Sequence, residues 1–245
     1  MNQRQKLTLI ALLLYWPAIF VLSHIPIPKL VYEAQVSDKA IHFVVYLILV
    51  FLLWFIVSPT KKVNWRKPSV WCVLVATVAY SIADEVLQSY VGRNCDVADV
   101  LANMSAVVAG VLLFMFLSFW PALLVVTSIC IFLLTNLAGE NPMKLLPVPS
   151  LLFYLSAYGF LCLLWIRHIS SYFGLKPGQP KWLSVVMPMP VALLVSVESF
   201  SVIIGRGFRP WRLTASAVGI VVIVVVTSFM ALRTRRSADD SKRPI

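Results

Sequence analysis

Long apolar runs separated by short polar segments dominate the chain. Each run is about as long as a helix that crosses a bilayer, roughly 20 residues at a rise of about 1.5 Å each. A break at Trp120-Pro121 is expected, because the fused apolar run would be far too long for a single span. The sequence MPMP at Met187–Pro190 predicts a kink. The pattern thus predicts eight spans: Leu7–Ser23, Ala40–Val57, Ser69–Ser89, Val100–Trp120, Pro121–Leu137, Leu151–Ile166, Leu183–Ile203 and Leu213–Leu232.

Composition agrees with this pattern. Hydrophobic residues make up 60% of the chain and charged residues 13%, and the mean hydropathy is +0.87. These values exclude an ordinary soluble domain. They predict an all-α, polytopic membrane helix bundle whose partners are membrane lipids. The net charge of +11 is attributed to membrane topology, so no nucleic-acid partner is expected.

The charged residues sort by loop. With the N-terminus in the cytoplasm, 14 of the 21 Lys and Arg residues fall on the cytoplasmic side, as the positive-inside rule requires. Eight of the ten acidic residues then fall on the outer side. We therefore expect a multi-pass protein of the bacterial cytoplasmic (inner) membrane with both termini inside. The four cysteines form no C-x-x-C pair, so neither a disulfide nor a thiolate metal site is indicated.

The second half of the chain weakly repeats the first. YWPAIF at Tyr15–Phe20 resembles FWPALL at Phe119–Leu124, and EVLQSYVGR at Glu85–Arg93 resembles ESFSVIIGR at Glu198–Arg206. We interpret residues 1–120 and 121–232 as two four-helix units in the same orientation, followed by a polar cytoplasmic tail at 233–245. The degenerate second unit keeps Glu198 and Arg206.

Charge distinguishes the two predicted units. At an offset of 113 residues, Asp84 is replaced by Val197 and Asp99 by Arg212. The acidic residues are therefore concentrated in the first unit, where we expect the functional site.

Polar residues in the first unit recur at helical spacing. Three stripes are expected to share helix faces: Asp38, His42 and Tyr46; Asp84, Glu85 and Gln88; and Asp96, Asp99 and Asn103. All three lie at outer helix ends, so we expect them to converge on an outward-facing polar site. The catalytic candidates are Asp84, Glu85 and His42. The substrate-binding candidates are Lys39, Gln88, Arg93, Asp96, Asp99 and Asn103, and the second-unit candidates are Glu198 and Arg206.

These stripes resemble the motifs of the VanZ-like family of multi-span bacterial membrane proteins. The resemblance lies in S-D-K-x-x-H-F-x-x-Y at Ser37–Tyr46 and in D-E-x-x-Q followed by G-R-x-x-D-x-x-D-x-x-x-N within Asp84–Asn103. It implies a role in the cell envelope, and the founding member is associated with low-level resistance to the glycopeptide teicoplanin. The family pattern has a glycine soon after the asparagine, whereas here the next glycine is Gly110.

Three functions remain open for this site. One is an enzyme acting on a lipid-linked or anionic envelope substrate, with Asp84 or Glu85 as general base and His42 as general acid. The second is a transporter or flippase for an anionic lipid or drug. The third is a non-catalytic envelope protein whose buried polar network fixes helix packing. No cofactor is required, although a divalent cation held by Asp84, Glu85, Asp99 and His42 is conceivable.

Overall fold

The computed structural model describes residues 3–25, 37–59, 62–91, 96–137, 147–175, 177, 179 and 181–240, with side chains up to residue 234. Its regular elements within these ranges are helices, and eight of the helical segments are long and apolar enough to cross a membrane. This confirms the all-α fold and the eight expected spans. The orientation of the termini stays a prediction. The chain forms two compact units, Met1–Asn141 and Pro142–Ile245.

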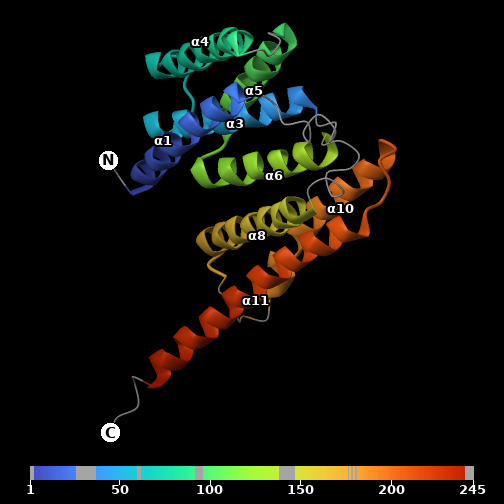
Figure 1. Ribbon diagram of the computed structural model, residues 1–245. Coiled ribbons are helices and arrows are strands. Elements are labelled where there is room, and N and C mark those ends of the chain that lie inside the picture. Colours follow the sequence, from blue (N-terminus) through green and yellow to red (C-terminus); the bar gives the residue numbers. More distant parts are fainter. Residues whose placement is uncertain are drawn as a thin grey trace. The chain divides into compact units, whose positions relative to one another are not determined.

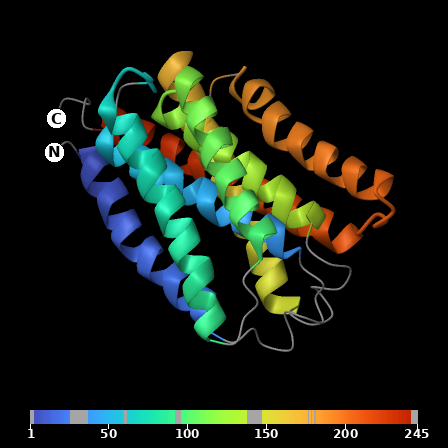
Figure 2. The same ribbon diagram turned by 90° about the horizontal axis from the view of Figure 1, so that it is seen from above.

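The first compact unit is built around one central helix. Its described helices are α1 (Gln3–His24), α3 (Asp38–Val57), α4 (Pro68–Tyr90), α5 (Val97–Phe116) and α6 (Phe119–Leu137). Helix α3 contacts each of the other four, and Figures 1 and 2 show it among them. It is also the span with the largest buried share. A helix that is apolar on all sides is suited to such a position, because no face requires solvent.

A small residue lets α5 approach α3 closely. A Cβ atom on Gly110 would come within 2.6 Å of Val50 Cγ1. Ala106, one turn earlier on α5, is fully buried. Small residues four apart allow membrane helices to pack at short distance. Gly110 thus makes a close α3–α5 approach even though it follows Asn103 later than in the family pattern.

The break between the fourth and fifth spans lies earlier than expected. Helix α5 ends at Phe116 and α6 begins at Phe119, so the predicted break at Trp120-Pro121 is wrong by a few residues. Pro121 instead occupies the first turn of α6. A proline is tolerated there because the amide hydrogen that it lacks would have no partner within the helix.

The second compact unit contains α8 (Pro147–Tyr172), α9 (Trp182–Val186), α10 (Pro188–Ile203) and α11 (Pro210–Asp240). Helices α8 and α11 pack closely through Gly159 and Gly219, and a Cβ atom on Gly219 would collide with the carbonyl oxygen of Leu155. The predicted seventh span is divided into α9 and α10 at Met187, just before Pro188, where the sequence predicts a kink. The main packing contact within this unit is thus the close approach of the α8 and α11 backbones.

Helix boundaries in the two units have the spacing of the weak sequence repeat. Helices α4 and α10 end 113 residues apart, at Tyr90 and Ile203, and α5 and α11 begin 113 residues apart, at Val97 and Pro210. The compact units divide at Asn141, so α6 packs in the first. The proposed duplication with its boundary at residue 120 stays a prediction.

Candidate functional site

Polar side chains gather where four helices of the first unit end. They come from the C-terminal ends of α1 and α4 and from the N-terminal ends of α3 and α5. We call this group the polar cluster, and it comprises Ser23, His24, Asp38, Lys39, His42, Ser81, Asp84, Glu85, Gln88, Asp96, Asp99 and Asn103. The structure therefore brings together every described first-unit candidate. Arg93 lies outside the described residues.

Asp84 is buried and satisfied at both carboxylate oxygens. Ser23 donates a hydrogen bond to Oδ1 at 3.0 Å, and Gln88 donates one to Oδ2 at 2.9 Å from four residues along α4. His24 Nδ1 lies 3.9 Å from Oδ1. Asp84 thus joins α1 to α4, and its oxygens are already engaged by protein donors.

Lys39 holds two carboxylates at the start of α5. Its ammonium lies 2.9 Å from Asp96 Oδ2 and 3.3 Å from Asp99 Oδ1. Asp96 is also the N-cap of α5, and its Oδ1 accepts from the Ala98 amide at 2.8 Å. That amide, and then Lys39, lower the pKa of Asp96 below its usual range, because both favour the charged form. Lys39 therefore positions acidic groups.

His42 lies at the centre of the polar cluster and is buried. Its Nδ1 is 3.2 Å from Asn103 Oδ1 and 3.6 Å from Glu85 Oε1. Asn103 in turn donates to Ser81 Oγ at 2.9 Å. The other ring nitrogen, Nε2, lies 3.8 Å from an oxygen of Asp38 and 3.8 Å from an oxygen of Asp99. The ring thus has acceptors on both sides.

Glu85 differs from its acidic neighbours. Its side chain is 1% exposed, and among the described residues neither carboxylate oxygen has a partner at hydrogen-bond distance and angle, although the Asp96 backbone amide acts on it electrostatically. Among the described residues, the ring of His42 lies beside it, with Nδ1 3.6 Å from Oε1. A buried carboxylate without hydrogen bonds is costly, because it gives up hydration without replacing it. Such a group is a candidate for chemistry or ligand binding.

The second-unit candidates have a different environment. Glu198 is buried and forms a two-pronged pair with Arg212, with Nε–Oε1 at 2.6 Å and Nη2–Oε2 at 2.8 Å. Arg206 is partly buried in the loop between α10 and α11, flanked by Gly205 and Gly207 in left-handed conformation. Both carboxylate oxygens of Glu198 are therefore engaged by Arg212 in a closed ion pair.

Sequence reasoning missed several members of the polar cluster. Ser23 and His24 come from α1 and are not among the candidate residues named from the sequence. Ser81 lies one turn before the acidic pair on α4 and orients Asn103. No spacing rule connects α1 to α4, because the two segments are about sixty positions apart in the chain. The sequence analysis also did not identify Arg212 as the partner of Glu198.

A comparison with family models identifies the first unit. The model described as VanZ/LLP1 matches residues 4–118. This segment is a VanZ-like domain. The match confirms the resemblance carried by the motifs, and the eight apolar helices of the described residues support a multi-pass membrane protein that contains a VanZ-like domain. The VanZ-like domain contains every residue of the polar cluster. Comparisons with curated proteins and with solved structures gave no match.

Ligand atoms for a metal ion occur together at one point of the VanZ-like domain. Atoms of Asp38, His42 and Asp99 lie within 4.8 Å of one another. His42 and Asp99 belong to the set named from sequence, whereas Asp84 and Glu85 are not part of this trio. Asp84 is instead held by Ser23 and Gln88.

Proposed function

We propose that this VanZ-like protein acts in the bacterial cell envelope, and that its polar cluster binds a lipid-linked or anionic envelope substrate at the outer leaflet. The observation that carries the proposal is Glu85, a buried carboxylate beside His42 to which the described residues supply no hydrogen bond. A network that served only helix packing would satisfy such a group, as it satisfies Asp84. The outward orientation rests on the distribution of Lys and Arg.

The chemistry of the pair supports a site that handles protons. The carboxylate of Glu85 and the imidazole of His42 are close enough to exchange a proton after a small side-chain movement. Lys39, by contrast, is engaged by Asp96 and Asp99. We therefore assign general base chemistry to Glu85 and a positioning role to Lys39.

Teicoplanin susceptibility provides the test, because the family resemblance points to glycopeptide resistance. Wild-type protein, Glu85→Gln and Thr77→Val are expressed in the same susceptible bacterial host, and the minimum inhibitory concentration is measured at matched membrane abundance. Thr77 is a matched control, since it is buried on the same helix and its hydroxyl donates to the carbonyl of Val73 within that helix.

We expect wild type and Thr77→Val to raise the inhibitory concentration equally and Glu85→Gln to lose the effect. Equal protection by wild type and Glu85→Gln would overturn the role of Glu85. If the wild-type protein gave no protection, the proposed link to glycopeptides would be wrong.

A further inference from the structure

The hydrogen bonds around His42 define which ring nitrogen carries a proton. Asn103 donates its amide to Ser81, which turns Asn103 Oδ1 toward His42 Nδ1 at 3.2 Å. The carboxylate of Glu85 lies on the same side, at 3.6 Å. Nδ1 therefore faces two acceptors and acts as the donor. In neutral imidazole, the lone pair is then on Nε2.

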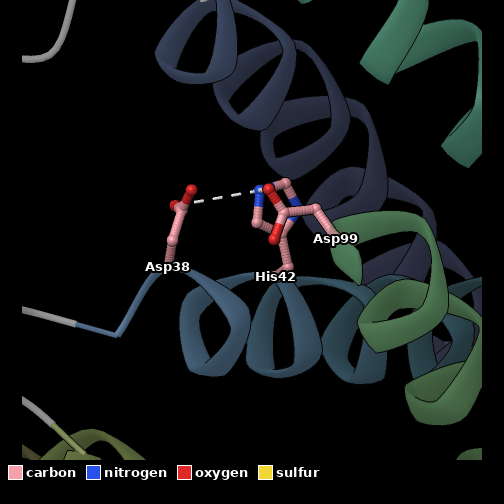
Figure 3. Close-up of side chains that lie close together, drawn as sticks. All are labelled: Asp38, His42 and Asp99. Atoms are coloured by element: carbon pink, nitrogen blue, oxygen red, sulfur yellow. Dashed lines mark ion pairs between the residues drawn. The ribbon is translucent and has the colours of Figure 1, made fainter. Parts of the chain in front are cut away.

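That lone pair points toward more acceptors. Nε2 lies 3.8 Å from Asp38 Oδ1 and 3.8 Å from Asp99 Oδ2, too far for a hydrogen bond to either. Figure 3 shows Asp38 and His42 side by side on α3, with Asp99 reaching them from α5. With His42 in this neutral tautomer, three electron-pair donors thus converge from two helices. A cation would remove the repulsion that this arrangement creates.

We propose that Asp38, His42 and Asp99 bind a divalent transition-metal cation such as Zn²⁺ or Mn²⁺. Their ligand atoms lie within 4.8 Å of one another, and a small side-chain movement would bring them to the separation of at most about 4.4 Å that two bonds of about 2.0–2.2 Å allow. One imidazole and two carboxylates suit these metals better than Mg²⁺, which prefers oxygen ligands. With only three protein ligands, the cation keeps positions open for another molecule.

The surroundings of the trio support this assignment independently. Metal-bound histidines usually donate their second nitrogen to a carboxylate or carbonyl, which is the position of Glu85 and Asn103 relative to His42. Glu85 itself is 1% exposed and has no hydrogen-bond partner among the described residues. Lys39 holds the other oxygen of Asp99, so Oδ2 is left to face His42. The unsatisfied Glu85 carboxylate is thus placed to polarise a metal-binding histidine.

The cation also resolves a difficulty in the proposed function, on which this step rests. Described acidic side chains outnumber cationic ones in the polar cluster, so an anionic substrate would be repelled. A divalent ion with open positions would attract an anionic oxygen, such as a phosphate oxygen, to the same place. The chemical class of the substrate would then be a phosphate-bearing lipid headgroup.

Binding of Mn²⁺ to the purified full-length protein tests the proposal. The protein is prepared in detergent micelles without an affinity tag, treated with chelator and titrated with Mn²⁺ while the free ion is followed by electron paramagnetic resonance. Pulsed measurements report whether an imidazole nitrogen is bound directly to the ion. The variants are Asp38→Asn, whose side chain is partly exposed, and His42→Gln. Thr77→Val is the matched control, because Thr77 is buried on α4, its hydroxyl donates to the Val73 carbonyl of the same helix, and it lies outside the polar cluster.

We expect one equivalent of bound Mn²⁺ with nitrogen coupling in wild type and in Thr77→Val. Asp38→Asn should bind roughly tenfold or more weakly, and His42→Gln should lose the nitrogen coupling. Absence of saturable binding by wild type would overturn the cation site. So would binding that is unchanged in both Asp38→Asn and His42→Gln, because the ion would then sit elsewhere.

The two proposals fail separately. If Mn²⁺ binds as expected but Glu85→Gln protects against teicoplanin like wild type, the proposed function is wrong and the cation site remains. If Glu85→Gln loses protection while wild type binds no Mn²⁺, the cation site is wrong and the role of Glu85 remains.

Discussion

The surroundings of the buried glutamates Glu85 and Glu198 differ in the two units, because the residue fourteen positions later is Asp99 in the first and Arg212 in the second. In the second unit, Glu198 meets Arg212 fourteen residues later and the pair closes with two short hydrogen bonds. In the first unit, the residue fourteen positions after Glu85 is Asp99, so Glu85 meets no arginine there. The described residues supply its carboxylate with no hydrogen bond, and Asp99 faces Lys39 and His42. One closed ion pair stabilises its unit, whereas the open acidic cluster is available for a ligand.

The largest effect is expected from breaking the closed pair. Glu198→Gln leaves the buried Arg212 guanidinium without its counter-charge, which should lower the free energy of unfolding by about 3–5 kcal/mol. Thermal unfolding of the purified protein, followed by circular dichroism, measures this loss. A double variant, Glu198→Leu with Arg212→Leu, should recover most of it, because both charges are removed together. Unfolding of Glu198→Gln at the wild-type temperature would contradict the comparison.

The second largest difference is expected between alanine substitutions at the glycines of the two close helix contacts. Gly219→Ala places a methyl group against the backbone carbonyl of Leu155, whereas the methyl group of Gly110→Ala meets the side chain of Val50. A side chain can rotate away, but a backbone carbonyl moves only with its helix. We expect Gly219→Ala to destabilise by roughly 1–3 kcal/mol and Gly110→Ala by less, in the same thermal assay. The reverse order would show that α3 and α5 are the more rigid contact.

Glu85 should respond in the opposite direction from Glu198. In chelator-treated protein, Glu85→Gln removes a buried charge to which the described residues supply no hydrogen bond. The free energy of unfolding should therefore stay constant or rise by about 1 kcal/mol at most. Glu198→Gln at matched conditions serves as the reference. A loss of several kcal/mol for Glu85→Gln would mean that Glu85 forms a stabilising pair with charged His42, and the comparison between the units would fail.

The smallest effect is expected at Asp96, the exposed edge of the cluster. Its lowered pKa means that the ionised side chain stabilises the fold above the usual pKa near 4, and that this contribution disappears as the pH falls through the lowered value. Asp96→Ala should therefore unfold at a lower temperature than wild type at pH 7, and the difference should shrink below about pH 4. A difference independent of pH would indicate that the helix cap and Lys39 do not depend on the charge.

Much of the fold follows from the sequence because the bilayer imposes it. An apolar run of about 20 residues must satisfy its own backbone, so it forms a helix, and the number of runs gives the number of spans. The pairing of Asp84 with Gln88 is also local, since residues four apart on a helix face the same side. The position of the α5–α6 break was less predictable, because Pro121 can either end one helix or begin the next.

Part of the candidate site could likewise be predicted from the sequence, and part could not. Sequence spacing alone placed His42 near Asp38 and placed Asp96, Asp99 and Asn103 on one face, and motif resemblance identified the VanZ-like domain. Only the tertiary structure decided that α1 contributes Ser23 to Asp84, that Lys39 takes Asp96 and Asp99, and that Glu85 has no hydrogen-bond partner. The reason is physical: contacts within a helix depend on spacing of three or four residues, whereas contacts between helices depend on how the helices pack and rotate, which residue spacing does not encode.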